Sequence, residues 1–378
     1  MSENILQNGL TGRSKLAILD GNCFIASGSY AKFSTGWNVK GFPTGGISAL
    51  MKAICIRYRD WEDVIVVFDT KSFRKEKYPT YKANRRKDNK TVVQIKALVP
   101  LLRKAGINVF QVDGFEGDDL IWNCVKANYD SYDRIDIHTV DMDIACNIDA
   151  LGKVRIKGAT NVIPEITRNN FSSTVDKEYE IPFNAILPWK VLFGCTSDTI
   201  HPIEPAYARQ LWSAFIKFGN SIVANKGMLS DRKVMDLFFS KIEAGIPKEL
   251  AESLRQNIEL VYPVEIKEVD GVPISFDCTS IGDMEEIRKI LSLFMLARVC
   301  KNYTGKYLIP LDKRQEDWLF KRANDYKMGV TCMDEDMPIG KSLKDEVYID
   351  MDEDITTAFK EKFERDDIVS GGSIGSFR

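Results

Sequence analysis

Three apolar runs in this sequence each end on an aspartate, and this feature constrains the fold more than any other. The runs are Leu16–Asp20, Val64–Asp69 and Ile135–Asp141. Apolar strands that alternate with helical segments are typical of an α/β protein with a buried, parallel sheet. Because ligands bind outside the carboxyl ends of such strands, we expect the three terminal aspartates to face one crevice.

A fourth acidic group follows another short apolar segment. Glu116, Asp118 and Asp119 lie within four residues, and Asp143 follows Asp141 at a spacing of two, which puts both side chains on one side of an extended chain. Acids in a first helical turn stabilise the helix by about 0.3–1 kcal/mol each, which explains one or two of them. Crowded carboxylates stay ionised together only beside a cation. The set therefore predicts a metal site, although a single strand-ending aspartate is more often a turn or a helix cap.

The composition narrows the kind of metal. There are only two histidines, His138 and His201, which argues against a histidine-rich zinc site or a histidine-based nucleophile relay. Carboxylate oxygens remain, and these hard ligands favour Mg²⁺ or Mn²⁺. The chemistry that needs several of them is metal-assisted phosphodiester hydrolysis, in which two ions roughly 3.5–4 Å apart activate a water and stabilise the leaving oxygen. We expect water to be the nucleophile and no covalent intermediate to form.

Composition also predicts the compartment. Eight cysteines are scattered without CxxC spacing, as expected for reduced thiols. No apolar stretch reaches the length of about 18 residues that a membrane span needs, and the first residues lack an apolar signal segment. We therefore expect a cytoplasmic protein that has no membrane partner.

Charge is distributed unevenly along the chain. Residues 331–378 contain 13 acidic and 6 basic residues, whereas residues 71–90 contain nine basic residues against two acidic ones. A basic segment beside an acidic metal crevice suits a polyanionic substrate, since metals and basic side chains together hold phosphates that the acids alone would repel. Charge runs are usually solvated loops, but three aromatic residues within this one and a site aspartate before it favour a substrate-binding role.

The strand and helix patterns predict four parts. These are an N-terminal extension (residues 1–14), an α/β core (residues 15–190), a largely helical region (residues 191–310) and an acidic C-terminal extension (residues 311–378) whose Ser-Gly-Gly-Ser end should be mobile. Within the core, periodicity predicts helices over residues 44–58, 92–105 and 118–128, and a peripheral hairpin over residues 153–163.

Several of these segments together resemble the bacteriophage and bacterial 5′-3′ exonuclease and flap endonuclease family, which includes ribonuclease H-like phage enzymes. The matching motifs are Leu19–Asn22, Phe68–Asp69, Tyr78–Arg85, Glu116–Asp119, Asp141–Asp143 and Gly194–Asp198. The resemblance implies a PIN-like core with a central, mostly parallel sheet, a helical arch at about residues 70–105, and a helix–three-turn–helix-like element that binds DNA.

The resemblance also implies roles for individual residues. Two Mg²⁺ or Mn²⁺ ions are expected, held by Asp20, Asp69, Glu116, Asp118, Asp119, Asp141, Asp143 and Asp198. Lys82 and Arg85 are expected to act in catalysis with Asp69 and Asp118, by contacting the reacting phosphate and stabilising charge in the transition state. The expected substrate contacts are Tyr81, which would stack on a base, and Lys71, Arg74 and Arg86.

Two departures from the family pattern affect the second ion and the duplex. Cys195 stands where the last acidic motif usually has its first aspartate, and a soft thiol is a poor Mg²⁺ ligand, so the second ion should bind more weakly. The segment Thr199–Ala206 contains two prolines and no glycine. Because prolines remove backbone donors, we expect the turn that grips duplex DNA to be altered or lost.

The favoured interpretation is a metal-dependent 5′ nuclease that removes flaps or RNA primers in replication or repair, in the host cytoplasm if a phage encodes it. Its expected partners are nucleic acids with 5′ ends, flaps or RNA-primed duplexes, and a replication protein is a candidate partner of the acidic C-terminal region. Two alternatives stay open. Cys195 and the altered turn motivate a catalytically weakened DNA-binding or scaffold protein, and the core fold allows a PIN-type ribonuclease acting on single-stranded RNA. The Tyr81–Arg85 segment argues against the latter.

Overall fold

The computed structural model describes residues 13–328, except residues 33, 35, 60, 62, 86, 87, 159–164, 176–180, 224–230 and 279–281. The predicted substrate contact Arg86 and residues 329–378 of the acidic extension therefore lie outside the described residues. No helix in the described part combines the length and the apolar character needed to cross a bilayer.

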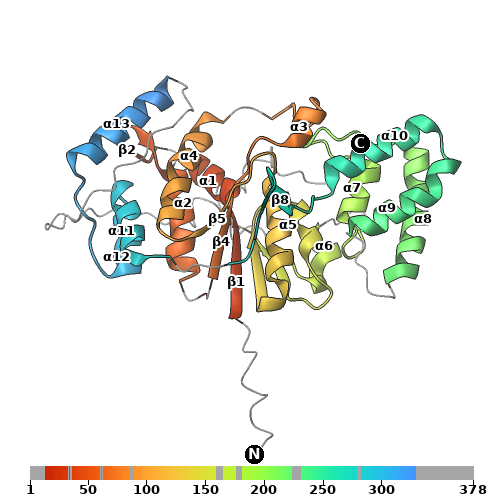
Figure 1. Ribbon diagram of the computed structural model, residues 1–378, viewed down its shortest axis with the longest axis horizontal. Helices are drawn as coiled ribbons and strands as arrows, with labels where there is room; N and C mark the ends of the chain where they lie inside the picture. Colours follow the sequence, from red (N-terminus) through yellow and green to blue (C-terminus); the bar gives the residue numbers. More distant parts are fainter. Residues whose placement is uncertain are drawn as a thin grey trace, which may run out of the picture.

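A five-stranded, fully parallel sheet forms the centre of the protein (Figure 1). In the order β5-β4-β1-β6-β7, its strands are Asn108–Phe110, Asp63–Val67, Arg13–Asp20, Tyr132–His138 and Val154–Lys157. The register pairs Asp20 with Val67 and Leu19 with His138, so the carboxyl ends of three strands are level. This confirms the predicted α/β class and the expected common edge.

β7 lies where the sequence predicted a peripheral hairpin. The sequence suggested a peripheral hairpin at residues 153–163, but Val154 and Ile156 are buried in the main core and β7 pairs in parallel with β6. On its other side, Ile156 of β7 exchanges two backbone hydrogen bonds with Ile166, of 3.0 and 2.8 Å, in an antiparallel bridge. The segment is therefore a buried core strand with an antiparallel return beside it. Residues 159–164, which include the second arm of the predicted hairpin, are not described.

Helices cover both faces of the sheet (Figure 1). One face carries α1 (Gly21–Tyr30), α2 (Gly45–Lys52) and α4 (Asn89–Lys104), and the other carries α5 (Gly117–Asn128). The helix predicted over residues 44–58 is α2 continued by a π-helical turn at Ala53–Arg57.

The expected arch at residues 70–105 differs from the structure. α3 (Phe73–Lys77) is a single short helix that, with the turns after it, crosses the carboxyl edge of the sheet (Figure 1). The second half of the range is α4, whose Val93 and Leu98 are fully buried. Its amphipathic pattern puts this apolar stripe against α1 and α2, so α4 is a core helix.

The remaining helices divide between the two faces. The core on the α5 side is extended by four helices, α7 (Ile186–Phe193), α8 (Pro205–Val223), α9 (Arg232–Ile242) and α10 (Lys248–Val261). The α4 side is joined by three, α11 (Met284–Leu293), α12 (Ala297–Thr304) and α13 (Lys313–Lys327) (Figure 1). The short helix α6 is Phe171–Val175. Two small antiparallel pairs are β2 (Asn38–Val39) with β3 (Phe42–Pro43), and β8 (Glu268–Val269) with β9 (Val272–Pro273).

α13 begins the segment that the sequence assigned to an acidic extension from residue 311. Its Leu319 is fully buried and its Trp318 ring lies 6.4 Å from the Phe42 ring of β3. Apolar residues on one side of this helix therefore make it part of the core, and Arg322 is buried with them.

Candidate active site

The strand-ending acids meet above the carboxyl edge of the sheet. Asp20 caps α1: one oxygen accepts the N–H of Cys23 at 2.9 Å and the other accepts the Thr139 hydroxyl at 2.8 Å. The same hydroxyl accepts the N–H of Asp141 at 3.0 Å. Thr139, which the sequence reasoning did not single out, thus ties the ends of β1 and β6 together.

α5 begins directly at this edge. Glu116 is its N-cap residue, and the Asp69 carboxylate accepts the N–H of Gly117 at 2.5 Å. A Cβ atom on Gly117 would lie 2.7 Å from the Asp69 oxygen, so this approach requires glycine. The Glu-Gly-Asp-Asp motif is therefore a helix start that lets β4 and α5 bring their acids together.

Too little positive charge balances these acids. Burial, with the charge of Asp69, raises the pKa of Asp20 to about 7. Burial, with the charge of Asp141, raises the pKa of Asp118 well above its ordinary value. Burial raises the pKa of Asp143 to about 7, although Lys190 opposes this shift. Burial is the largest cause of each shift, and it raises the pKa of Asp69 as well. The nearby basic side chains do not offset it, which is a deficit of positive charge that divalent cations would remove.

Basic side chains pair with the other acids of the site. The Lys82 ammonium lies 2.6 Å from Glu116 Oε1, and Arg85 Nη2 lies 2.7 Å from Asp198 Oδ1. Burial pushes the pKa of Asp198 up, but Lys82, Lys190 and Arg85 together hold it below its ordinary value. Asp198 is therefore an ionised carboxylate in a positive environment.

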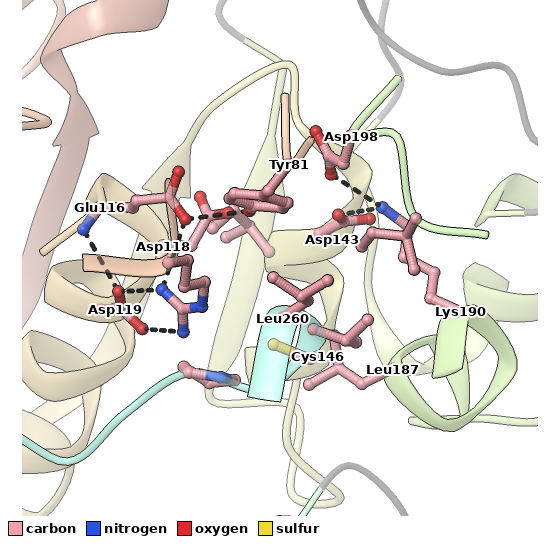
Figure 2. Close-up of a pocket in the computed structure, with 15 residues that line it drawn as sticks. Tyr81, Glu116, Asp118, Asp119, Asp143, Cys146, Leu187, Lys190, Asp198 and Leu260 are labelled. Carbon is pink, nitrogen blue, oxygen red and sulfur yellow. Dashed lines mark hydrogen bonds and ion pairs between the residues drawn. The ribbon is translucent and has the colours of Figure 1, made fainter. Parts of the chain in front are cut away.

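The donors fit Mg²⁺ or Mn²⁺ in chemistry, since they are oxygens from carboxylates. The distances between these carboxylates are not those of a metal-binding site. Within the described ranges, no three acidic, histidine or cysteine side chains lie close enough together to hold an ion. Glu116, Asp118, Asp143 and Asp198 instead line one cavity of about 30 Å³ (Figure 2), which has room for a water. Ion binding would therefore require some of the acid–lysine pairs to separate.

Lys190 is a site residue that the sequence reasoning missed. Its ammonium pairs with Asp143 and lies 3.9 Å from Asp198 Oδ2 (Figure 2). Burial alone would lower its pKa, but Asp143 and its neighbours hold the pKa of Lys190 well above its ordinary value. A signal existed, because Lys190 is the only charged residue in the apolar segment Ala185–Phe193.

Asp119 and Arg74 form a structural pair, which corrects the predictions of a metal ligand and a substrate contact. Two guanidinium nitrogens of Arg74 donate to the two oxygens of Asp119 at 2.7 and 2.8 Å. Arg74 also donates to the carbonyls of Glu259 and Tyr262, and each Asp119 oxygen accepts a backbone N–H as well. Each Asp119 oxygen thus accepts two hydrogen bonds, and these bonds connect α5 to α3 and to the end of α10.

We expect Arg74→Met to lower the free energy of unfolding by about 3–5 kcal/mol, because Asp119 would stay buried without its charged partner. Urea denaturation of the metal-free protein measures the change. The matched control is Lys71→Met, which removes an exposed lysine whose partner Glu76 is also exposed and should alter stability little. If both variants had the same stability, Arg74 would have no structural role.

Tyr81 is buried, which corrects the prediction that it stacks on a base. Its side chain is 3% exposed, its hydroxyl donates to Glu116 Oε2 at 3.0 Å, and its ring packs with Cys195, Ile200 and Leu260. Reaching a base would require breaking this cluster, so Tyr81 acts here as an anchor for the basic segment.

The altered turn after α7 is the surface on which this basic segment rests. Cys195 and Ile200 exchange two backbone hydrogen bonds of 2.9 Å, which close the turn. Lys82, in a left-handed conformation with φ of 52°, donates its backbone N–H to the carbonyl of Asp198 at 2.9 Å. Asn84 Nδ2 donates to the carbonyl of Thr196 at 3.3 Å. These contacts direct the Lys82 ammonium toward the acids.

Known proteins provide an independent comparison. The family model for the 5′-3′ exonuclease, N-terminal resolvase-like domain, matches residues 15–176. A 5′-3′ exonuclease of Buchnera aphidicola is 34% identical over 209 residues, covering 54% of this chain and 70% of that protein. A 5′-3′ exonuclease of Mycoplasma pneumoniae is 26% identical over 212 residues, covering 54% and 71%. A flap endonuclease of bacteriophage T5, solved with DNA and metal ions, aligns with 84% of this chain and 99% of its own at 17% identity and a TM-score of 0.46.

Proposed function

The chain belongs to the 5′-3′ exonuclease family, and on this premise we propose that it is a divalent-metal-dependent nuclease that hydrolyses phosphodiester bonds near 5′ ends. The observation that carries the proposal is the meeting of acids from three segments at one cavity, which are Glu116 and Asp118, Asp143, and Asp198, with Lys82 and Arg85 paired to two of them. The relatives from Mycoplasma pneumoniae and Buchnera aphidicola, both named 5′-3′ exonucleases, support the 5′-to-3′ polarity.

The site residues would divide the work between binding ions and holding phosphate. The acids proposed to bind ions are Asp69, Glu116 and Asp118 for one, Asp141, Asp143 and Asp198 for a second, with Asp20 supporting them. Bound Mg²⁺ or Mn²⁺ would supply an activated water and neutralise the leaving oxygen. Lys82 and Arg85 would stabilise negative charge on the phosphate.

The second ion should be the weaker one. Cys195 Sγ lies 3.7 Å from Asp198 Oδ2 and offers a soft sulfur where a carboxylate would bind better. Lys190 competes with an ion for both Asp143 and Asp198. The described cysteines are buried thiols, which suits action in a reducing compartment during replication or repair.

We expect a 5′-labelled flap and an RNA-primed duplex to release short 5′ products in Mg²⁺ and none in EDTA. A 3′ flap of the same sequence is the matched control and should stay intact. Tight flap binding without a metal-dependent product would replace the proposal with the scaffold alternative. Cleavage confined to single-stranded RNA would replace it with the ribonuclease alternative.

A further inference from the structure

One face of β6 and β7 is polar and takes no part in the proposed site. Alternate residues point to opposite faces of a strand, and Ile135, Ile137, Val154 and Ile156 fill the core on the α5 side. The positions between them are Arg134, Asp136, Arg155 and Lys157, with His138 at the end of β6. The core on this second side takes residues from β1 and β4, but none from β6 or β7 among the residues described.

Four cations gather on this face around one buried carboxylate. Asp136 is fully buried; its oxygens accept two bonds of 2.8 Å from Arg134, and Lys157 Nζ lies 3.2 Å away. Arg155, next to Asp136 in the register, lies 3.3 Å from Glu165. Arg57, from the π-helical turn, is exposed and places Nη1 3.5 Å from His138 Nδ1. We call Arg57, Arg134, Arg155 and Lys157 the cationic shelf; two carboxylates oppose its four positive charges.

Two buried rings at the base of the shelf leave polar atoms without partners among the described residues. His138 and Tyr58 are buried with their rings edge to face at 4.8 Å, and within the described part of the chain neither His138 Nε2 nor the Tyr58 hydroxyl has a hydrogen-bond partner. Unsatisfied polar atoms of this kind are uncommon in native proteins. Burial, with the charges of Arg57 and Lys157, lowers the pKa of His138 well below its ordinary value, so the imidazole is neutral. His138 and Tyr58 therefore bring polar atoms to this edge of the core, where their rings also pack against Phe24 and Trp61.

The shelf adjoins the candidate active site. His138 precedes Thr139, whose hydroxyl contacts both Asp20 and Asp141, and the Thr139 N–H donates to the carbonyl of Lys157 at 3.3 Å. A polyanion that reached the acids would first meet Lys157, at the carboxyl end of β7, whereas Arg134 lies four residues before His138 on β6.

We propose, resting on the nuclease function above, that the cationic shelf is a second nucleic-acid contact that binds backbone phosphates outside the active site. Three of its four cations are arginines, whose planar donors match phosphate oxygens. Parallel sheets are normally covered on both faces, and a phosphate backbone is complementary in charge to what this face presents. The site recognises phosphates and reads no bases, so it contributes affinity without sequence preference.

The test uses the double variant Arg57→Gln/Lys157→Gln, which leaves the two bonds from Arg134 to Asp136 intact. Binding of a labelled 5′ flap is followed by fluorescence anisotropy in EDTA over a range of NaCl concentrations. Removing one cation that binds a phosphate lowers the slope of log K against log salt by about 0.7–0.9. For the two cations together we expect the slope to fall by about 1.4–1.8, with kcat at saturating flap unchanged in Mg²⁺.

The matched control is Arg314→Gln/Lys321→Gln on α13, which removes the same charges from exposed positions and should leave the slope near that of wild type. The single variant Arg57→Gln provides the same readout, at about half the size, if the double variant folds poorly. An unchanged slope would overturn the proposal. Tighter flap binding would also overturn it. If the wild-type protein did not bind the flap at all, that result would contradict the proposed nuclease function, on which the shelf proposal rests.

Discussion

Asp118→Asn is expected to abolish metal-dependent flap cleavage and, in EDTA, to make the protein more stable than wild type. Burial and the charge of Asp141 raise the pKa of Asp118 well above its ordinary value, and Lys82 opposes this shift only in part. An ionised carboxylate in such a place opposes folding. The amide keeps the shape and removes the charge, so we expect a gain of about 1–3 kcal/mol, the scale on which poorly satisfied buried groups cost stability.

The gain in the free energy of unfolding of Asp118→Asn over wild type should increase with pH. Because the pKa of Asp118 is higher in the folded protein than in the unfolded chain, the unfolded chain releases this proton first as pH rises. The free energy of unfolding of wild type therefore falls as pH rises from the ordinary value of 3.8 toward the raised folded pKa. Asparagine carries no such proton, so the advantage of the variant should be small near about pH 4 and large near about pH 8.

Urea denaturation in EDTA at both pH values, with cleavage of a labelled flap in Mg²⁺, measures both effects. Asp113→Asn is the matched control: it makes the same change at an exposed position outside the cavity and should cleave as wild type does. Wild-type cleavage by Asp118→Asn would remove Asp118 from the site, and a loss of stability at about pH 8 would contradict the charge deficit.

Lys82→Met should lower kcat on a 5′ flap by about 10²–10³-fold, the usual effect of losing one donor that stabilises transition-state charge. The Lys82 ammonium lies 2.6 Å from Glu116, and its backbone is held on Asp198. A cation fixed at this position would act on the reacting phosphate more than on distant parts of the substrate. DNA affinity should therefore change only modestly, since the other basic residues of the segment remain.

The same variant should bind Mn²⁺ more tightly in the absence of DNA, because Glu116 loses the lysine that competes with the ion. Single-turnover kinetics gives the rate, and titration calorimetry gives the ion affinity. Lys75→Met, an equal change at an exposed position of α3, is the control for nonspecific charge removal. A defect confined to DNA affinity would mean that Lys82 only binds substrate.

The sequence predicted the sheet and its acidic edge because both depend on local patterns. Strand-ending aspartates lie at the carboxyl edge of any parallel sheet. The α/β class alone was therefore enough to predict that Asp20, Asp69 and Asp141 lie at the same edge. The level register of β1, β4 and β6 then brought them to the same height.

The errors came from contacts between distant segments. Asp118 and Asp119 are adjacent on a helix, where successive side chains point about 100° apart, so a sequence motif alone cannot say which one pairs with a cation from another segment. Asp119 faces Arg74 because the carbonyls of Glu259 and Tyr262 hold that guanidinium. The burial of Tyr81 likewise depends on Ile200 and Leu260, more than a hundred residues away.

Ion binding by the assembled acids is tested most directly by titrating Mn²⁺ into the protein without DNA and following the free ion by electron paramagnetic resonance. Wild type should remove Mn²⁺ from solution at a tight site and a weaker one, and Asp118→Asn/Asp141→Asn should abolish the tight site while remaining folded by circular dichroism. Identical Mn²⁺ binding by the two proteins would show that these carboxylates do not form the metal site.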